Sequence, residues 1–260
     1  MSIIHEEITF ESEGNVLVGN LLFPTEKKYP PPYPAVIYFH GFPGNADKVS
    51  GVGLSLVRMG YAYLAFDFQG IRLSGGEFSL AGEIQNAKEA IDFIRSQDFT
   101  EIDIKRIGVY GESLGGAVAI CTSAMRKDIQ LTVVRAPVYD TVEFFDFPWI
   151  PDTFRALALD MPDEVRGLEK TGKLAELKAE ANQPKFNPME AISKISPRKV
   201  FILASGQDNL IPIEGVRKLF AKAQKPRILK VQPFADHNLS SHEFYQEAVG
   251  IVTSWIKERL

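Results

Sequence analysis

The chain has 260 residues, of which 45% are hydrophobic and 24% charged, so it is long enough to bury a large apolar core in one domain, residues 1–260. A net charge of −4 argues against nucleic acid as a partner, and the single cysteine excludes an internal disulfide and fits a reducing compartment. No apolar stretch reaches the roughly 18 residues of a membrane span, and the first residues lack a secretory pattern, so we expect a cytoplasmic protein.

The amino-terminal segment predicts an antiparallel hairpin. Residues 7–13 and 16–23 alternate polar and apolar side chains, and Gly14 lies in the tight turn between them. A proline-rich link at residues 30–34 is extended by its fixed backbone angles and leads into the rest of the chain. We therefore expect the hairpin to form one edge of the main sheet.

Beyond this link, apolar segments with strand character alternate with segments of helical period, which predicts parallel strands joined by crossover helices. The predicted strands are residues 35–40, 62–68, 106–110, 131–136, 199–205 and 227–234. The predicted helices are residues 48–59, 81–96, 114–125, 213–223 and 242–258. Because such crossovers are right-handed, the helices should cover both faces of one mostly parallel, eight-stranded sheet.

Residues 139–195 break this alternation, because they carry no strand signal and are far too long for an ordinary connection. We expect an inserted helical cap, with a charged amphipathic helix over residues 163–181. Its first part is rich in aromatic side chains, of which Phe144, Phe145 and Trp149 are candidate substrate-binding residues. Two interpretations are open: the aromatics form a wall for an apolar or aromatic acyl group, or they pack as a lid core without substrate contact.

The strongest chemical signal follows the predicted strand 106–110, where residues 111–115 read Gly-Glu-Ser-Leu-Gly and a helix comes next. In such a turn the serine sits on a strained backbone and projects its hydroxyl above the sheet, and the glycines leave room for the turn. The spacing alone is modest evidence, but its place between strand and helix is specific. We predict that Ser113 is a nucleophile; the alternative is a tight glycine turn with an incidental serine.

A serine hydroxyl needs a base, and the base needs an acid that fixes its tautomer. His237 and Asp208 each follow a predicted strand, and the carboxyl ends of these strands should share the edge at which α/β sheets bind ligands. The other histidines are placed less well. Asp140, after the strand 131–136, would lie at the same edge and is the alternative acid. We therefore predict a catalytic triad of Ser113, Asp208 and His237.

Acyl transfer also needs hydrogen-bond donors for the oxyanion. The backbone amide of Leu114, directly after the nucleophile, is one predicted donor. The other should come from residues 40–45, a glycine-rich loop in which Phe42 is the better donor because Pro43 has no amide hydrogen. The alternative for this loop is a plain turn rich in glycine and proline.

With these motifs assembled, the chain resembles the α/β-hydrolase superfamily over nearly its whole length. The matching segments are His-Gly-Phe-Pro-Gly-Asn at 40–45, Gly-Glu-Ser-Leu-Gly-Gly at 111–116, Gly-Gln-Asp at 206–208 and Asp-His-Asn at 236–238. Within the superfamily it is most similar to small carboxylesterases, including cinnamoyl and feruloyl esterases, and it is also similar to the catalytic domain of acylaminoacyl and prolyl peptidases. The resemblance implies an α/β-hydrolase fold.

One loop departs from the pattern of these relatives. Many of them carry Asp-x-Arg-Gly-x-Gly-x-Ser after the second main strand, whereas here Arg72 stands where the second glycine is expected. Arg72 either meets a substrate carboxylate or pairs with a nearby acid such as Asp67 or Glu77. We favour the ion pair.

Together these residues predict a serine hydrolase that cleaves carboxylic esters with a small to medium or aromatic acyl group through an acyl-enzyme. A small serine peptidase or amidase that uses the same machinery is the alternative, and a non-catalytic ligand-binding protein is a third hypothesis. We expect no metal or organic cofactor. The expected partner is a small-molecule ester, with no nucleic acid and no membrane, and the sequence leaves a homodimer open.

Overall fold

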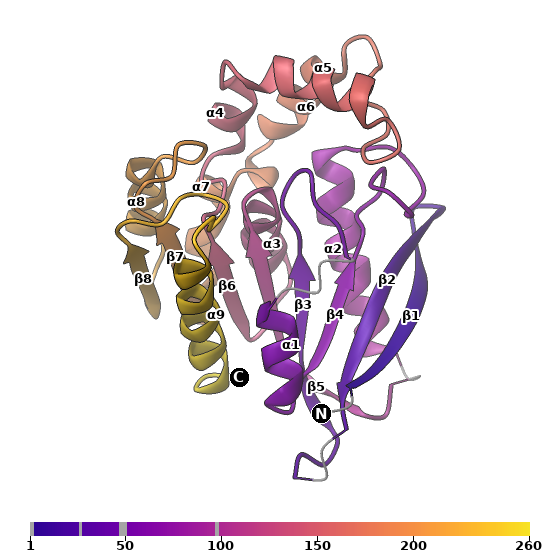
Figure 1. Cartoon of the computed structure of the whole chain (residues 1–260), viewed down its shortest axis with the longest axis vertical. Helices are drawn as coiled ribbons and strands as arrows, with labels where there is room; N and C mark the ends of the chain where they lie inside the picture. The colour runs from indigo at the N-terminus through magenta and orange to yellow at the C-terminus, as the bar shows by residue number, and fades with distance from the viewer. Residues whose placement is uncertain (1–2, 26–27, 47–50, 97–98) are drawn as a thin grey trace.

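The computed structural model describes residues 3–25, 28–46, 51–96 and 99–260, which form an eight-stranded sheet covered by helices (Figure 1). The strands are β1 (Ile3–Ser12), β2 (Asn15–Pro24), β3 (Tyr33–Phe39), β4 (Ala62–Phe66), β5 (Ile102–Glu112), β6 (Leu131–Arg135), β7 (Lys199–Ser205) and β8 (Arg227–Gln232). Their spatial order is β1-β2-β4-β3-β5-β6-β7-β8. The β1–β2 and β2–β4 pairs are antiparallel and the other five pairs are parallel. The predicted mostly parallel sheet is confirmed.

The amino-terminal hairpin lies at one edge of the sheet, as predicted. Ser12 pairs with Asn15 across a two-residue turn. Both turn residues have positive φ, 49° at Glu13 and 78° at Gly14. Two-residue turns of this kind match the right-handed twist of the strands that they join. The turn thus fixes the register of β1 against β2.

Helices cover both faces of the sheet. They are α1 (Gly51–Arg58), α2 (Leu80–Arg95), α3 (Leu114–Met125), α8 (Ile213–Lys222) and α9 (His242–Lys257). In Figure 1, α1 and α9 lie together in front of the sheet, and α2 and α3 lie behind it. Buried apolar side chains accordingly form two clusters, one on each face. Residues 48–50 of the first predicted helix lie outside the described residues.

Three helices lie above the carboxyl ends of the central strands (Figure 1). They are α4 (Thr141–Asp146), α5 (Ile150–Asp160) and α6 (Lys173–Ala181), which we call the cap helices. The rest of the expected insertion lies elsewhere: α7 (Pro188–Ala191) and the 3₁₀ turns on either side of it, Pro184–Phe186 and Ile192–Ile195, pack against α3. The cap helices are therefore the part of this segment that overhangs the sheet edge.

The predicted helix over residues 163–181 is wrong in its first half, because the observed helix begins at Lys173. The preceding residues make tertiary backbone bonds instead. The amide of Arg166 donates to the carbonyl of Gly70 at 2.8 Å, and the amide of Phe78 donates to the carbonyl of Arg166 at 3.0 Å. These bonds to the loop after β4 take the place of the predicted helical bonds in this part of the chain.

A carboxylate joins α6 to the first turn of α2. Glu180 accepts hydrogen bonds from the amides of Leu80 at 2.8 Å and Ala81 at 3.2 Å, two of the donors that a helix start leaves without an intrahelical partner. Glu83 lies in the same first turn of α2, is 2% exposed, and its Oε2 has no hydrogen-bond partner among the described residues. Burial, reinforced by Glu180, raises the pKa of Glu83 well above its usual value, so this carboxyl binds a proton more tightly in the folded protein.

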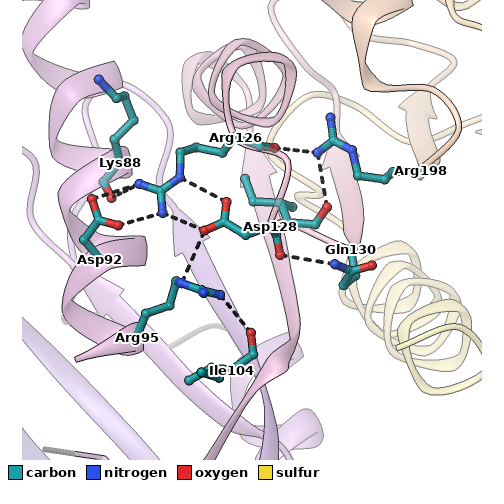
Figure 2. A network of polar contacts seen from close by, with 9 residues as sticks. Lys88, Asp92, Arg95, Ile104, Arg126, Asp128, Gln130 and Arg198 are labelled. Atoms are coloured by element: carbon teal, nitrogen blue, oxygen red, sulfur yellow. Dashed lines mark hydrogen bonds and ion pairs between the residues drawn. The ribbon is translucent and has the colours of Figure 1, made fainter. Parts of the chain in front are cut away.

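A polar network holds the carboxyl-terminal end of α3, where Arg126 follows the last helical residue (Figure 2). We call it the Arg126 network; it comprises Asp92, Arg95, Arg126, Asp128 and Arg198. Arg126 lies 2.6 Å from both Asp92 and Asp128, and Arg95 lies 3.3 Å from Asp128. Arg198 donates to the Arg126 carbonyl at 2.7 Å. The network thus fastens α2, the end of α3 and the start of β7 to one another.

Candidate active site

Ser113 lies on the sharp turn between β5 and α3. Its φ of 52° and ψ of −119° are strained for a residue with a side chain. Two backbone hydrogen bonds to β6 and the residues that follow it hold Ser113 in place. Its amide donates to the Arg135 carbonyl at 3.0 Å, and its carbonyl accepts from the Val138 amide at 2.9 Å. The surrounding backbone therefore maintains a conformation that the serine would not adopt by itself.

The two glycines of the motif are required by close backbone contacts. A Cβ on Gly111 would lie 2.2 Å from the carbonyl oxygen of Gly115, and a Cβ on Gly115 would lie 2.2 Å from that of Phe39. No side chain fits at such distances. The two glycines of the Gly-x-Ser-x-Gly motif thus allow α3 to pack directly against β3 and β5, with Ser113 at the turn between β5 and α3.

The structure brings Ser113, His237 and Asp208 together at the carboxyl ends of β5, β8 and β7. Ser113 Oγ lies 3.0 Å from His237 Nε2, and His237 Nδ1 lies 2.7 Å from Asp208 Oδ2. The Asp208 side chain is 1% exposed, and its Oδ1 accepts the amides of Leu210 at 3.0 Å and Ile211 at 2.7 Å. Because an ionised carboxylate only accepts, Nδ1 carries the proton and Nε2 offers its lone pair to the serine hydroxyl.

Asp140, the alternative acid of the sequence analysis, has another role. Its Oδ1 accepts the amide of Val142 at 2.9 Å and the Asn187 side-chain amide at 2.9 Å, so it caps the start of α4. The acid that the structure places beside His237 is therefore Asp208.

The loop after β3 runs against the serine. A Cβ on Gly41 would lie 3.1 Å from Ser113 Cβ, so the main chain of this loop passes within contact distance of the nucleophile candidate. Within the described residues, no hydrogen-bond acceptor is assigned to the amides of Phe42 and Leu114. These two donors, predicted from the sequence, are thus unengaged on either side of Ser113.

The side chain of His40 connects the same loop to the residues after β4. It is 2% exposed, its Nδ1 donates to the Gly41 carbonyl at 2.8 Å, and its Nε2 accepts the Phe68 amide at 3.3 Å. Burial lowers the pKa of His40 to about 4, so the ring is neutral at neutral pH, as these two bonds require. His40 therefore fixes the loop to the end of β4.

A cavity of about 520 Å³ opens over Ser113. Its roof comes from the cap helices and the residues beside them, which contribute Phe144, Trp149 and Thr153. Its floor includes polar side chains from the ends of β3, β5 and β6, namely Tyr38, Glu112 and Arg135. The roof and the floor thus offer a substrate two different chemical surfaces.

Phe145, which we expected to bind substrate, does not line this cavity. It is 1% exposed, and its ring lies 5.2 Å from that of Phe144 and 6.5 Å from that of Phe154, measured between centroids. On a six-residue helix, adjacent side chains point in different directions, so Phe144 reaches the cavity while Phe145 fills the interior of the cap. The packed-lid interpretation therefore describes Phe145, whereas Phe144 and Trp149 line the cavity and remain candidates for substrate contact.

The floor holds a buried ion pair that the sequence analysis missed. Glu112 Oε1 accepts from Arg135 Nε at 3.0 Å and from the Tyr110 hydroxyl, and Glu112 Oε2 accepts from the Tyr38 hydroxyl at 3.1 Å. Burial works to raise the pKa of Glu112, but Arg135 and these donors outweigh it and hold the pKa below its usual value. An arginine inside a predicted buried strand was the signal that could have revealed this Glu112–Arg135 pair.

Arg72 forms the ion pair that the sequence analysis favoured, with an acid that it did not name. Arg72 Nε lies 3.6 Å from Glu164 Oε2, and the Arg72 amide donates to the Glu164 carbonyl at 3.1 Å. Glu77, one of the two acids considered, bonds instead to Lys170. Arg72 is not among the residues that line the cavity over Ser113.

The described part of the chain shows neither a metal-ligand cluster nor a reactive cysteine. No three His, Cys, Asp or Glu side chains within it gather as metal ligands would. Cys121 is buried in α3, and burial raises the pKa of its thiol, which makes it inert. None of the described helices is long and apolar enough to cross a membrane.

The sheet order, the serine turn between strand and helix, and the convergence of three strand ends on one cavity define the α/β-hydrolase fold. Residues 49–260 match the prolyl oligopeptidase family, and the chain belongs to this family of hydrolases.

The chain is also similar to a curated protein in sequence and to solved structures in fold. The chain is 26% identical to the uncharacterized protein Rv2307c of Mycobacterium tuberculosis over 234 residues, which cover 89% of this chain and 72% of that protein. An esterase of Pyrococcus furiosus, PF2001, has the same fold with a TM-score of 0.74 at 21% identity, covering 99% of this chain and 92% of that one. The acetyl xylan esterase of Paenibacillus sp. R4 also superposes with a TM-score of 0.74, at 19% identity, covering 100% and 85% of the two chains.

Proposed function

We propose that this protein is a serine hydrolase that cleaves carboxylic esters. The observation that carries the proposal is the hydrogen-bonded chain from Ser113 Oγ through His237 to Asp208, which lies beneath a cavity able to hold a small substrate. The strained serine turn and the two unengaged amides beside it supply the remaining parts of an acyl-transfer site.

The reaction begins when Ser113 Oγ attacks the ester carbonyl while His237 Nε2 takes the hydroxyl proton. The amides of Phe42 and Leu114 donate to the oxyanion that forms, and Asp208 stabilises the imidazolium. The carbon–oxygen bond to the alcohol then breaks, and His237 delivers its proton to the departing oxygen. Water, deprotonated by His237, attacks the acyl-enzyme and releases the acid, which returns Ser113 to its hydroxyl form.

The roof of the cavity supports a preference for acyl groups of small to medium size or with an aromatic ring. Phe144 and Trp149 meet edge to face with 5.7 Å between their ring centroids, and both line the cavity. Aromatic rings bury a large apolar area, which suits an apolar or aromatic acyl group. Phe144→Ala should therefore raise KM for esters of aromatic acids more than for acetate esters.

A small peptidase or amidase is the second candidate, because the family to which the chain belongs is named for peptidases. The same serine, histidine and oxyanion donors would serve, but His237 would have to protonate a poorer leaving group. Matched substrates that differ only in an ester or an amide at the scissile bond separate the two candidates. The ester proposal expects the larger kcat/KM for the ester after correction for the intrinsic reactivity of each bond.

The decisive variant is Ser113→Ala, measured on a panel of aliphatic and hydroxycinnamate esters beside the unaltered protein. We expect kcat to fall by several orders of magnitude, on the order of the 10⁶-fold loss that removing such a nucleophile causes. A fluorophosphonate should label the unaltered protein at Ser113 and leave the variant unlabelled. Equal hydrolysis by both proteins would overturn the proposal, and hydrolysis of amides alone would favour the second candidate.

A further inference from the structure

The Glu112–Arg135 pair has bonding capacity that the described residues leave unused. Arg135 donates from Nε to Glu112 and from Nη1 to the His237 carbonyl at 2.7 Å, and the structure assigns its Nη2 no bond to a described residue. Nη2 is also not among the fully buried side-chain atoms without a partner in the described chain. Because Arg135 is 8% exposed and lines the cavity over Ser113, solvent reaches this nitrogen from the cavity.

The pair presents N–H donors to the cavity beside a carboxylate whose acceptor sites are mostly engaged by neighbouring side chains. Glu112 already accepts three hydrogen bonds, from Arg135 and from the hydroxyls of Tyr38 and Tyr110. Burial raises the pKa of both tyrosines well above the usual value, so both hydroxyls keep their protons. A ligand at this floor therefore meets the N–H groups of a planar guanidinium, which match carbonyl and carboxylate oxygens.

We propose that Arg135 is a specificity-determining residue that binds an acceptor oxygen of the substrate, a carbonyl or a carboxylate in a part of the molecule that is not cleaved. The proposal rests on the proposed function, since it places this second group while Ser113 attacks the ester. The substrate class is thus an ester with a second acceptor group, held between an apolar roof and a donor floor.

Arg135 has a positioning role as well, because its Nη1 bond holds the backbone of His237. A purely structural role would alter kcat for every substrate by a similar factor. Recognition alters the ratio between substrates that bear the acceptor and substrates that lack it, and it does so chiefly through KM. The ratio is therefore the measurement that tests the proposal.

The first experiment needs no variant. The first series consists of phenyl esters whose acyl chains have the same length and end in a carboxylate, a carboxamide or an isopropyl group of similar shape. A second series carries these three groups on the alcohol part. In at least one series we expect kcat/KM for the acceptor-bearing esters to exceed that of the isopropyl ester by about tenfold to hundredfold. Ratios near one in both series, at every chain length from two to five methylenes, would overturn the proposal.

The second experiment changes the floor. Removing Arg135 by itself leaves a buried carboxylate unpaired, so the informative variant is Glu112→Gln combined with Arg135→Met, which removes both charges. We expect the ratio to fall to about one, and Arg135→Lys to keep part of the preference for the carboxylate. Arg198→Met is the matched control: Arg198 also bonds to backbone carbonyls, but it lies at the far end of the sheet and should leave the ratio unchanged (Figure 2).

The outcomes separate the two proposals. If the unaltered protein hydrolyses esters through Ser113 but shows no preference for an acceptor, or if the double variant keeps the preference, the assignment of Arg135 is wrong and the ester hydrolase stands. If no ester is hydrolysed, or if Ser113→Ala is as active as the unaltered protein, the proposed function fails and the assignment of Arg135 fails with it. Should the double variant not fold, Arg135→Lys and the first experiment still decide.

Discussion

Two arginine–carboxylate networks lie at opposite ends of α3, a helix of 12 residues and hence about 18 Å in length. At the far end, Arg126 meets Asp92 and Asp128 with side chains that are 18%, 54% and 25% exposed (Figure 2). At the serine end, Arg135 meets Glu112 with side chains that are 9% and 21% exposed, and the cavity is the space that both line. The same pairing chemistry therefore operates at the outer surface in one place, where Asp92 is exposed, and beside a candidate active site in the other.

The difference teaches what each network can do. Exposed ion pairs gain little, because water and salt screen the charges, so the Arg126 network serves mainly to fasten three elements together. Each charged group of a buried pair has lost its hydration, and the opposite charge of the other group offsets that loss. The stability of each group therefore depends strongly on the other. The Glu112–Arg135 pair is thus poorly suited as a staple, but it keeps a guanidinium charged and oriented at the floor of the cavity.

Glu112→Gln tests this dependence and should have the largest effect on stability. The substitution keeps the shape of the side chain but leaves the Arg135 cation without a counter-charge, which typically costs about 3–5 kcal/mol. Urea unfolding followed by circular dichroism measures the change. The double variant with Arg135→Met should recover much of the loss, and a loss below about 1 kcal/mol for Glu112→Gln by itself would show that the pair is not coupled as described.

Glu83 sharpens the comparison, because it is a buried carboxyl without an arginine. Its pKa is raised where that of Glu112 is lowered, and a cation beside only one of them accounts for the difference. Since the folded-state pKa lies above the unfolded value, the folded protein holds a proton that the unfolded chain has released. Stability contributed at Glu83 is therefore present below about pH 4 and is lost as pH rises through the folded-state pKa.

Glu83→Gln should remove this penalty, since the amide resembles the protonated acid and carries no charge. We expect a gain of about 1–3 kcal/mol at pH 8 that shrinks toward zero near pH 4, measured as the free energy of unfolding across that range. Glu89→Gln on the same helix is the control, because Glu89 is not fully buried and no comparable gain should follow. A gain that does not depend on pH would mean that side-chain packing, and not ionisation, limits stability at this position.

The sequence predicts the elements that depend on local pattern and fails where tertiary contacts decide. The strand–serine–helix turn shows in five consecutive residues, although only Gly111 is required by a contact within the motif, and Gly115 is required by the carbonyl of Phe39 in β3. The helix predicted over 163–181 fails because the loop after β4 supplies backbone partners that no local pattern announces. Arg135 in a predicted buried strand signals the need for an acid, but Glu112 as that acid was hidden, since the two strands meet in a register that only the folded sheet defines.

Phe145 shows the same limit on a smaller scale. Aromatic clustering announces a hydrophobic cap, but which ring faces the cavity depends on the rotation of α4, a helix of only six residues. Phe144 faces the cavity and Phe145 does not. In contrast, Ser113, Asp208 and His237 could be placed together from the sequence because the carboxyl ends of parallel strands must meet at one edge.

Asp92→Asn is the counterpart of Glu112→Gln at the exposed end of α3, and it should have the smallest effect. Both substitutions remove the negative charge of a carboxylate paired with an arginine and keep its shape, but Arg126 retains Asp128 and contact with water. We expect a loss of less than about 1 kcal/mol that diminishes further in 1 M salt, measured by the same urea unfolding. A loss as large as that of Glu112→Gln would mean that the number of bonds, and not burial, decides what an arginine–carboxylate pair contributes, and the contrast between the two ends of α3 would then disappear.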